Sequence, residues 1–164
     1  ATACGIAVGS VYGYFPTKAD LTAAVLTRFF DENLSDELCV VRPGERFTSY
    51  VRRFREALCA ARADMSVDWF AEMRRLPSGE QEALEAVRAP MLTHIERGLG
   101  RVLDADEAVD RSRLVGRMSA EALCRYVLRS IFASLMEGGE CETLFALLDA
   151  SLYDDIAEEK DAKK

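Results

Sequence analysis

Apolar residues recur at helical spacing along most of the chain after residue 16. The first such stripe predicts a helix from Thr17 to about Leu38 and consists of Leu21, Val25, Leu26, Phe29, Phe30 and Leu34. Thr17 followed by Asp20 forms a capping-box signature directly after Pro16, which marks the start of this helix. Pro43 and Gly44 then interrupt the pattern, because neither residue continues a helix well.

The second predicted helix has the cleanest spacing in the chain. Its apolar positions are Phe47, Tyr50, Val51, Phe54, Leu58 and Ala61. The other positions carry arginines, namely Arg46, Arg52, Arg53 and Arg55. The simplest interpretation of these arginines is a solvated face.

Four further helices follow by the same reasoning. A short apolar helix containing Trp69, Phe70, Met73 and Leu76 ends at the sequence PSG. Ser78 and Gln81 form another capping box, and the helix that follows carries Leu84 to Val102 on one face, with Pro90 expected to bend or divide it near residues 88–89. A long helix is expected to begin at Asp104 or Asp106 and to end at Gly138-Gly139, and a last one runs from about Cys141. No segment longer than a few residues has strand periodicity, so the predicted fold class is all-α.

Composition narrows the classes of protein that fit. The length of 164 residues suits one compact domain, and no apolar run approaches the roughly 18–20 residues that cross a bilayer. The chain opens with no basic-then-apolar leader, and its five cysteines contain no C-x-x-C pair. Both features predict reduced thiols in the cytoplasm and no membrane partner.

Candidate catalytic chemistry is sparse. The single histidine, His94, excludes most zinc sites and most acid–base chemistry at neutral pH. No nucleophile elbow, phosphate loop, dinucleotide fingerprint or H-x-x-x-H motif occurs. A cysteine nucleophile paired with His94 stays open, although no spacing selects one cysteine. The expectation is a protein that is not an enzyme, with no catalytic residue, metal or cofactor.

The segment from Gly5 to Lys18, GIAVGSVYGYFPTK, differs from the rest of this acidic chain. It contains no acid, and residues 1–30 carry a net charge of +1, which leaves −8 for the remainder of the total of −7. A glycine turn before a short helix is typical of a helix-turn-helix. Residues 3–26 closely resemble the end of the DNA-binding domain of TetR-family transcriptional regulators, whose pattern is A-G-V-S-x-G-T-L-Y-x-H/Y-F-x-S/N-K-x-x-L. Eleven positions meet the pattern or a conservative variant of it: Gly5, Ile6, Gly9, Ser10, Val11, Tyr12, Tyr14, Phe15, Thr17, Lys18 and Leu21.

The resemblance implies a DNA-binding surface on this segment. Tyr14 and Lys18 would contact phosphates, Ser10 and Tyr12 would face the groove, and Ala7 or Val8 would meet thymine methyl groups. Two positions depart from the pattern: Ala7 replaces the usual serine, and Gly13 weakens the helix by about 1 kcal/mol relative to alanine. A complete domain of this family has two further helices, so roughly thirty residues are expected before Ala1. The alternative is a degenerate domain.

The resemblance also implies the organisation and function of the whole chain. Residues 1–38 would be the end of the helix-turn-helix with a connecting helix, and residues 39–164 a ligand-binding and dimerisation domain. The expected function is a ligand-responsive repressor that binds a palindromic operator as a homodimer and is released by a small, mostly hydrophobic molecule. The alternative is a helical ligand-binding or interaction module without DNA binding.

Two sets of candidate residues belong to the second domain. Soft and bulky side chains of the middle helices are candidates for the ligand site, although each could equally be plain core: Tyr50, Phe54, Trp69, Phe70, Met73, Met91, His94, Ile95, Met118 and Tyr126. His94 beside Ile95 is expected to be partly buried. Additional small or apolar positions on the last two helices predict the dimer surface: Ser119, Leu123, Ser130, Ala133, Ala146, Leu147, Ala150 and Ser151.

Overall fold

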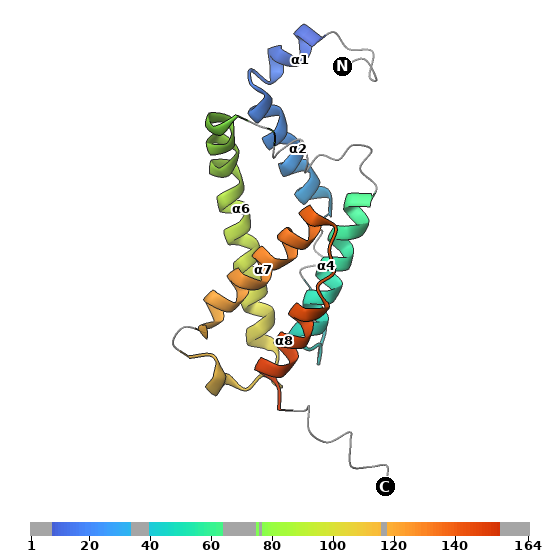
Figure 1. The fold of residues 1–164 in the computed structure, drawn as a ribbon, viewed down its shortest axis with the longest axis vertical. Helices are drawn as coiled ribbons and strands as arrows, with labels where there is room; N and C mark the ends of the chain where they lie inside the picture. The colour runs from blue at the N-terminus through green and yellow to red at the C-terminus, as the bar shows by residue number, and fades with distance from the viewer. Residues whose placement is uncertain (1–7, 34–39, 64–74, 76, 116–117, 155–164) are drawn as a thin grey trace. The chain divides into compact units, whose positions relative to one another are not determined.

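The computed structural model describes residues 8–33, 40–63, 75, 77–115 and 118–154, and every regular element in these ranges is helical (Figure 1). The all-α prediction is therefore confirmed. The elements, in chain order, are α1 (Val8–Tyr14), α2 (Lys18–Asn33), α4 (Phe47–Ala63), α6 (Ser78–Ala105), the 3-10 helix η2 (Arg111–Arg113), α7 (Ala120–Glu137) and α8 (Glu142–Leu152).

These helices belong to two compact units. The first contains α1, α2 and the part of α6 up to Thr93. The second contains α4, the part of α6 from His94 onward, η2, α7 and α8.

The predicted capping box at the start of α2 is confirmed in atomic detail. The Thr17 N–H donates to Asp20 Oδ2 at 2.9 Å, and the Asp20 N–H donates to Thr17 Oγ1 at 3.1 Å. Two N–H groups at the helix start, which lack partners within the helix, are thereby satisfied. The buried face of α2 contains Ala19, Thr22 and Phe29, and Thr22 is accommodated there because its hydroxyl donates to the Lys18 carbonyl at 2.8 Å.

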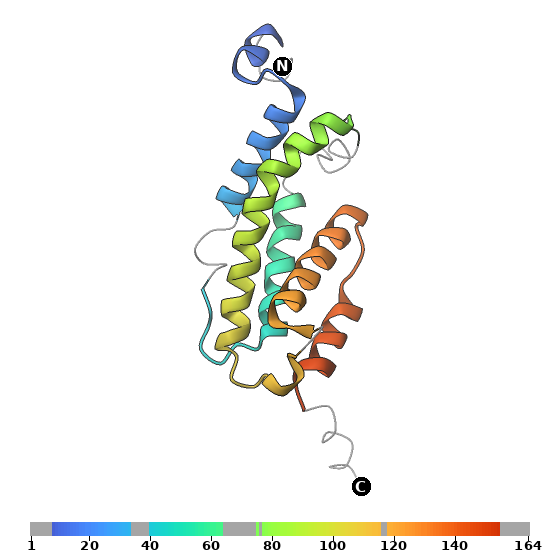
Figure 2. The same ribbon diagram turned by 90° about the vertical axis from the view of Figure 1, so that its left-hand side faces the viewer.

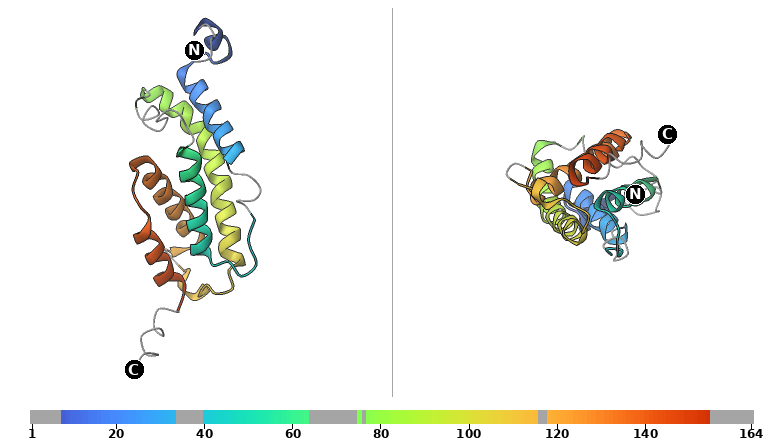
Figure 3. Two further views of the ribbon diagram at one scale, coloured as in Figure 1. Left: turned by 90° about the vertical axis from the view of Figure 1, so that its right-hand side faces the viewer. Right: turned by 90° about the horizontal axis from the view of Figure 1, so that it is seen from below.

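Helix α4 organises the core of the second unit. All six apolar positions predicted for it are buried, and α4 contacts both α7 and α8. Figure 3 (left) shows α4, the second part of α6, α7 and α8 side by side, and their buried residues form the core of this unit. Phe47 and Val51 are completely enclosed, as are Ile131, Leu103 and Leu152 from the other elements. Burial of each such side chain contributes about 1.5–3 kcal/mol, which makes this core the main source of the unit's stability.

One predicted helix boundary is wrong in the region between Pro90 and Ser119. Pro90 was expected to bend or divide its helix, and division is excluded because α6 continues through Pro90 to Ala105. The long helix does not begin at Asp104 or Asp106, because α7 begins only at Ala120, where the Ser119 hydroxyl accepts the Ala122 N–H at 3.2 Å. The predicted glycine end of α7 is confirmed: Gly138 has a φ of 71°, a left-handed conformation that glycine adopts without steric cost.

The segment from Asp106 to Arg113 is a connector that caps three helix ends. The Asp106 carboxylate accepts the Phe47 N–H at the start of α4, at 2.7 Å. The Arg111 guanidinium donates to the Leu103 carbonyl at the end of α6, at 2.7 Å, and that of Arg113 donates to the Ala150 carbonyl of α8, at 3.3 Å. Of the acids that resembled the start of a long helix, Asp106 caps α4 instead, and Asp110 caps only the short η2, where it accepts the Ser112 N–H. Figure 2 shows this connector between the end of α6 and α7.

The solvated face predicted for the arginines around α4 is only partly present, because Arg46 is exposed whereas Arg52, Arg53 and Arg55 are half-buried. Arg53 forms a two-bond ion pair with Glu45, at 2.9 and 3.0 Å, with side chains only 19% and 10% exposed. Arg52 lies over the Phe145 ring at 4.1 Å, Arg46 lies over the Tyr153 ring at 4.8 Å, and Arg55 donates to the Gly139 carbonyl at 2.7 Å. These side chains hold α4 to its neighbours.

Candidate functional site

The first candidate site is α1, the acid-free helix of the first unit. Its seven residues contain no charged side chain, and the Phe15 N–H donates to the Val11 carbonyl at 2.9 Å, which continues the helical bonding one residue further. Pro16 and the capping box of α2 follow at once, and they place Lys18 at the first position of that helix.

Most of the predicted DNA-binding residues in the described part of this segment have exposed side chains. Tyr14 is 83% exposed, Tyr12 is 59% exposed, and Ser10 and Lys18 are also exposed. Val11 and Phe15, which were expected to pack inward, are half-buried. Two large phenols held outward on a helix without carboxylates form a surface that can donate hydrogen bonds to anions without like-charge repulsion.

Two of the predicted DNA-binding positions cannot be placed in this surface. Ala7 lies outside the described residues, and although Val8 begins α1, its side chain lies outside them too.

The structure describes only part of the ligand pocket that the sequence predicted in the middle helices. Trp69, Phe70 and Met73 lie outside the described residues. Tyr50, Phe54 and Ile95 are buried in the core of the second unit, where the rings of the first two stack with centroids 6.3 Å apart.

Met91 and His94 complete the predicted middle-helix set in the described part of the chain. Met91 is half-buried. His94 is exposed, so the expectation that it is partly buried is wrong.

The second candidate site is an apolar groove between α7 and α8, within the second unit. It has a volume of about 420 Å³, and Met118 and Tyr126 of the predicted ligand set both line it. Three residues predicted for the dimer surface also line it, namely Leu123, Leu147 and Ser151. Sequence reasoning missed Ala122, Leu144 and Leu148, the remaining lining residues.

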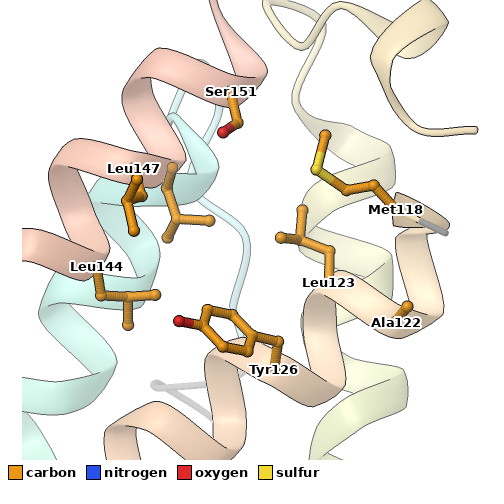
Figure 4. A pocket seen from close by; sticks show the side chains of 8 residues that line it. Met118, Ala122, Leu123, Tyr126, Leu144, Leu147 and Ser151 are labelled. Carbon is orange, nitrogen blue, oxygen red and sulfur yellow. The ribbon is translucent and has the colours of Figure 1, made fainter.

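The groove forms on α8 because two of its buried leucines, Leu144 and Leu148, also face the space between α7 and α8. Leu144 and Leu148 are buried with Phe145 and Leu152 against the core, while Leu147 and Ser151 continue the lining outward at helical spacing. Met118 and Ser151 stand at one end of the groove, and the Tyr126 ring extends toward Leu144 at the other (Figure 4). No charged side chain lines it.

Two large side chains that line the groove are exposed to solvent for about half of their surface. Tyr126 is 56% exposed and Leu147 is 52% exposed, and the outward positions of α8 beside them are uncharged: Thr143, Ala146 and Ala150. A surface helix usually presents charged or polar residues on its outer face. The uncharged run of α8 from Thr143 to Leu148 is the sequence signal that could have identified the groove.

A second hollow, in which five of the ten lining residues are charged, lies where the segment before α4 meets the end of α6. Residues 41–46 and 105–108 line its volume of about 510 Å³. Asp106 at this hollow is already occupied, because its two carboxylate oxygens accept from the Phe47 N–H, the Tyr153 hydroxyl and the Ala108 N–H. We therefore assign this hollow a structural role.

Nucleophilic and metal chemistry receive little support from the described residues. Burial, with smaller contributions from Asp104 and Glu96, raises the pKa of the Cys124 thiol to about 12, so this thiol stays protonated and unreactive at neutral pH. No group of three or more histidine, cysteine, aspartate or glutamate side chains in the described ranges is arranged to hold a metal ion.

Comparison with protein-family models, with curated proteins and with solved structures finds no match for this chain. Among the helices that the structure describes, none combines the length and the apolar character needed to cross a membrane.

Proposed function

We propose that this protein is a ligand-responsive DNA-binding transcriptional regulator, a repressor that a small molecule releases from its operator. The observation that carries the proposal is the surface of α1: two exposed tyrosines on a helix without acids, followed directly by Lys18 at the start of a capped helix. The sequence resemblance to TetR-family regulators supports the same assignment. In this proposal the protein acts in the cytoplasm.

Phosphate contact explains why this helix lacks carboxylates. DNA carries a dense negative charge, and a carboxylate on the facing helix would be repelled. Asp20 is the first acid after this segment, and its carboxylate accepts from the Thr17 N–H and hydroxyl, at 2.9 and 2.8 Å. Tyr14 and Lys18 would therefore position the helix on phosphates, while Ser10 and Tyr12 would face base edges.

Homodimerisation completes the proposed mechanism. Ala133 on α7 and Ala146 and Ala150 on α8 are exposed and small, so two copies could approach closely there. A two-fold dimer would present two copies of α1 to a palindromic operator whose half-sites lie about one helical turn apart, or a multiple of it.

The test is a salt-titrated binding assay on the protein as its gene encodes it, with the DNA upstream of that gene. We expect Lys18→Ala to lower the magnitude of the slope of log affinity against log salt by about one, because one phosphate contact is lost. Tyr14→Phe should weaken binding about tenfold on all sequences alike. Matched controls are Arg28→Ala, whose side chain is 78% exposed on α2, and Tyr126→Phe in the second unit.

A second candidate function, a helical ligand-binding module without DNA binding, is favoured by the groove between α7 and α8. The assay separates the two functions. A folded protein that binds no DNA at low salt would contradict the regulator and leave the ligand-binding module in place.

A further inference from the structure

We infer that the groove between α7 and α8 is a binding site for a neutral, elongated, largely apolar small molecule with a hydrogen-bonding group. The inference names the class of ligand for the proposed regulator. Only the regulatory role of this ligand rests on the proposed function. It moves the ligand site from the middle helices, where the sequence placed it, to the outer side of the last two helices.

The size of the groove points to a small molecule. Its volume of about 420 Å³ lies within the range of ligand sites, which is roughly 300–1,000 Å³. Eight residues line it, whereas a stable protein interface takes roughly 20–30 residues from each side. The lining on α8 runs from Leu144 to Ser151, a rise of about 10 Å at 1.5 Å per residue, so the occupant is elongated.

The chemistry of the lining sets the class of ligand. Leu123, Leu144 and Leu148 form a buried apolar base, and Met118 adds a flexible thioether that adapts to different shapes. No lining side chain carries a charge, so an ionised ligand would lose its hydration without gaining a partner.

Two hydroxyl groups give the groove its polar anchors. Ser151 stands at one end, and the Tyr126 hydroxyl extends toward Leu144 at the other (Figure 4). Each hydroxyl can both donate and accept a hydrogen bond, so either could fix one end of a neutral ligand. A few polar groups within an apolar lining are what a selective small-molecule site requires.

The site also suggests how a ligand would act. Leu147 and the neighbouring Ala146 and Ala150 belong to the surface that we propose for dimerisation. A molecule seated beside Leu147 would alter that surface, and binding of the ligand would be coupled to pairing of the two copies.

The experiment uses N-phenyl-1-naphthylamine, a neutral apolar amine whose fluorescence rises on transfer from water to an apolar site. We expect saturable binding to the chain in the absence of DNA. Ala122→Phe should fill the groove from α7 and weaken binding at least tenfold, because the new ring occupies the ligand volume. Ala60→Phe is the matched control, since Ala60 is exposed on α4 of the same unit, does not line the groove and lies outside the surface proposed for dimerisation. Ser151→Ala and Tyr126→Phe should each weaken binding severalfold.

Circular dichroism and thermal unfolding of each variant establish that it is folded, and sedimentation at the same concentrations reports its assembly. Equal probe binding by Ala122→Phe and the unaltered chain, or no saturable binding, would overturn the inference. A result in which the probe never binds and Ala122→Phe changes only dimer formation would also overturn it. The groove would then be occupied by a second copy of the chain. None of these readouts involves DNA, so failure here is distinct from failure of the regulator proposal.

Discussion

The carboxylate of Asp106 caps a helix that begins 59 residues earlier in the chain, because its Oδ2 atom accepts the Phe47 N–H at 2.7 Å. The same oxygen accepts the Tyr153 hydroxyl at 2.6 Å, and Oδ1 accepts the Ala108 N–H at 3.0 Å. Asp106 is only 5% exposed, so these three donors take the place of water. One side chain therefore ties together the start of α4, the end of α6 and the end of α8.

Replacement of Asp106 should be among the most destabilising changes in the second unit. Asp106→Ala leaves the buried donors of Phe47, Ala108 and Tyr153 without their acceptor, and we expect a loss of roughly 2–4 kcal/mol in the free energy of unfolding. Asp106→Asn keeps one carbonyl oxygen and should lose about half as much. Urea unfolding followed by circular dichroism measures both.

Asp104→Ala is the control for this experiment, since that side chain is 74% exposed and should change the free energy of unfolding by less than about 0.5 kcal/mol. Equal losses for Asp104→Ala and Asp106→Ala would contradict the capping role.

The Tyr153 hydroxyl should make the protein sensitive to alkali. Burial and the hydrogen bond to Asp106 raise the pKa of Tyr153 from 10.0 to about 12. Between these values the unfolded chain releases the proton while the folded chain keeps it, so stability falls as the pH rises from 10 to 12. Tyr153→Phe removes this contribution, and we expect a shallower fall in the free energy of unfolding over that range.

Tyrosinate absorbance provides a direct check on the folded protein. The unaltered chain should show a fraction that titrates near pH 12, and that fraction should be missing in Tyr153→Phe but present in Tyr126→Phe. A late fraction that survives in Tyr153→Phe would assign it to another residue.

Gly138 and Gly139 should respond differently to the same substitution. Gly138 has a φ of 71°, which strains any side chain, so Gly138→Ala should cost about 1 kcal/mol even though a new Cβ would meet nothing within 4 Å. Gly139 also has open space around its Cβ position, but its φ is not in the strained range, and Gly139→Ala should change stability far less. The melting temperatures of the two variants measure the difference. Gly139→Ala reports the effect of an added methyl group alone, and Gly138→Ala reports that effect together with backbone strain.

The ion pair between Arg53 and Glu45 should contribute stability above mildly acidic pH. The hydrogen bond from Arg53 lowers the pKa of the Glu45 carboxyl below its ordinary value, although burial opposes this shift. A lowered pKa adds stability that is present above the unfolded value and is lost as the pH falls through the folded value. Glu45→Gln should therefore lower the free energy of unfolding at neutral pH by about 1–2 kcal/mol and reduce its decline toward acid.

Exposed pairs provide the comparison for this prediction. Glu32→Gln breaks the pair with Arg28, whose side chains are 57% and 78% exposed, and should have little effect at either pH. Identical pH profiles for Glu45→Gln and the unaltered chain would contradict the assigned role.

Local sequence signals predicted those parts of the fold that depend on neighbouring residues. The buried face of α4, the capping box of Thr17 and Asp20 and the glycine end of α7 all follow from spacing along a single helix. The segment after Asp104 was mispredicted because its acids look like a helix start when read locally. Asp106 instead serves a helix end that is distant in sequence.

The candidate sites divide in the same way. The exposed tyrosines of α1 lie within one short segment, so their spacing could indicate a surface. The groove depends on how α7 and α8 pack against each other, which no single stripe encodes. The sequence therefore supplied some of its residues, such as Met118 and Tyr126, but assigned them to a pocket in the middle helices.

The Asp106 contact has a consequence for how the protein emerges from the ribosome. Helix α4 is synthesised long before its cap, and the second contact at its start, from the Thr48 N–H to the Tyr153 hydroxyl at 3.4 Å, spans 105 residues. Until Tyr153 has been translated, the N–H groups of Phe47 and Thr48 lack part of their native partners, and the apolar face of α4 is exposed to solvent and chaperones. Closure of the second unit is thus a late, non-local event that carries a large loop-entropy cost, and nascent chains that stall before Tyr153 should remain sensitive to protease throughout α4.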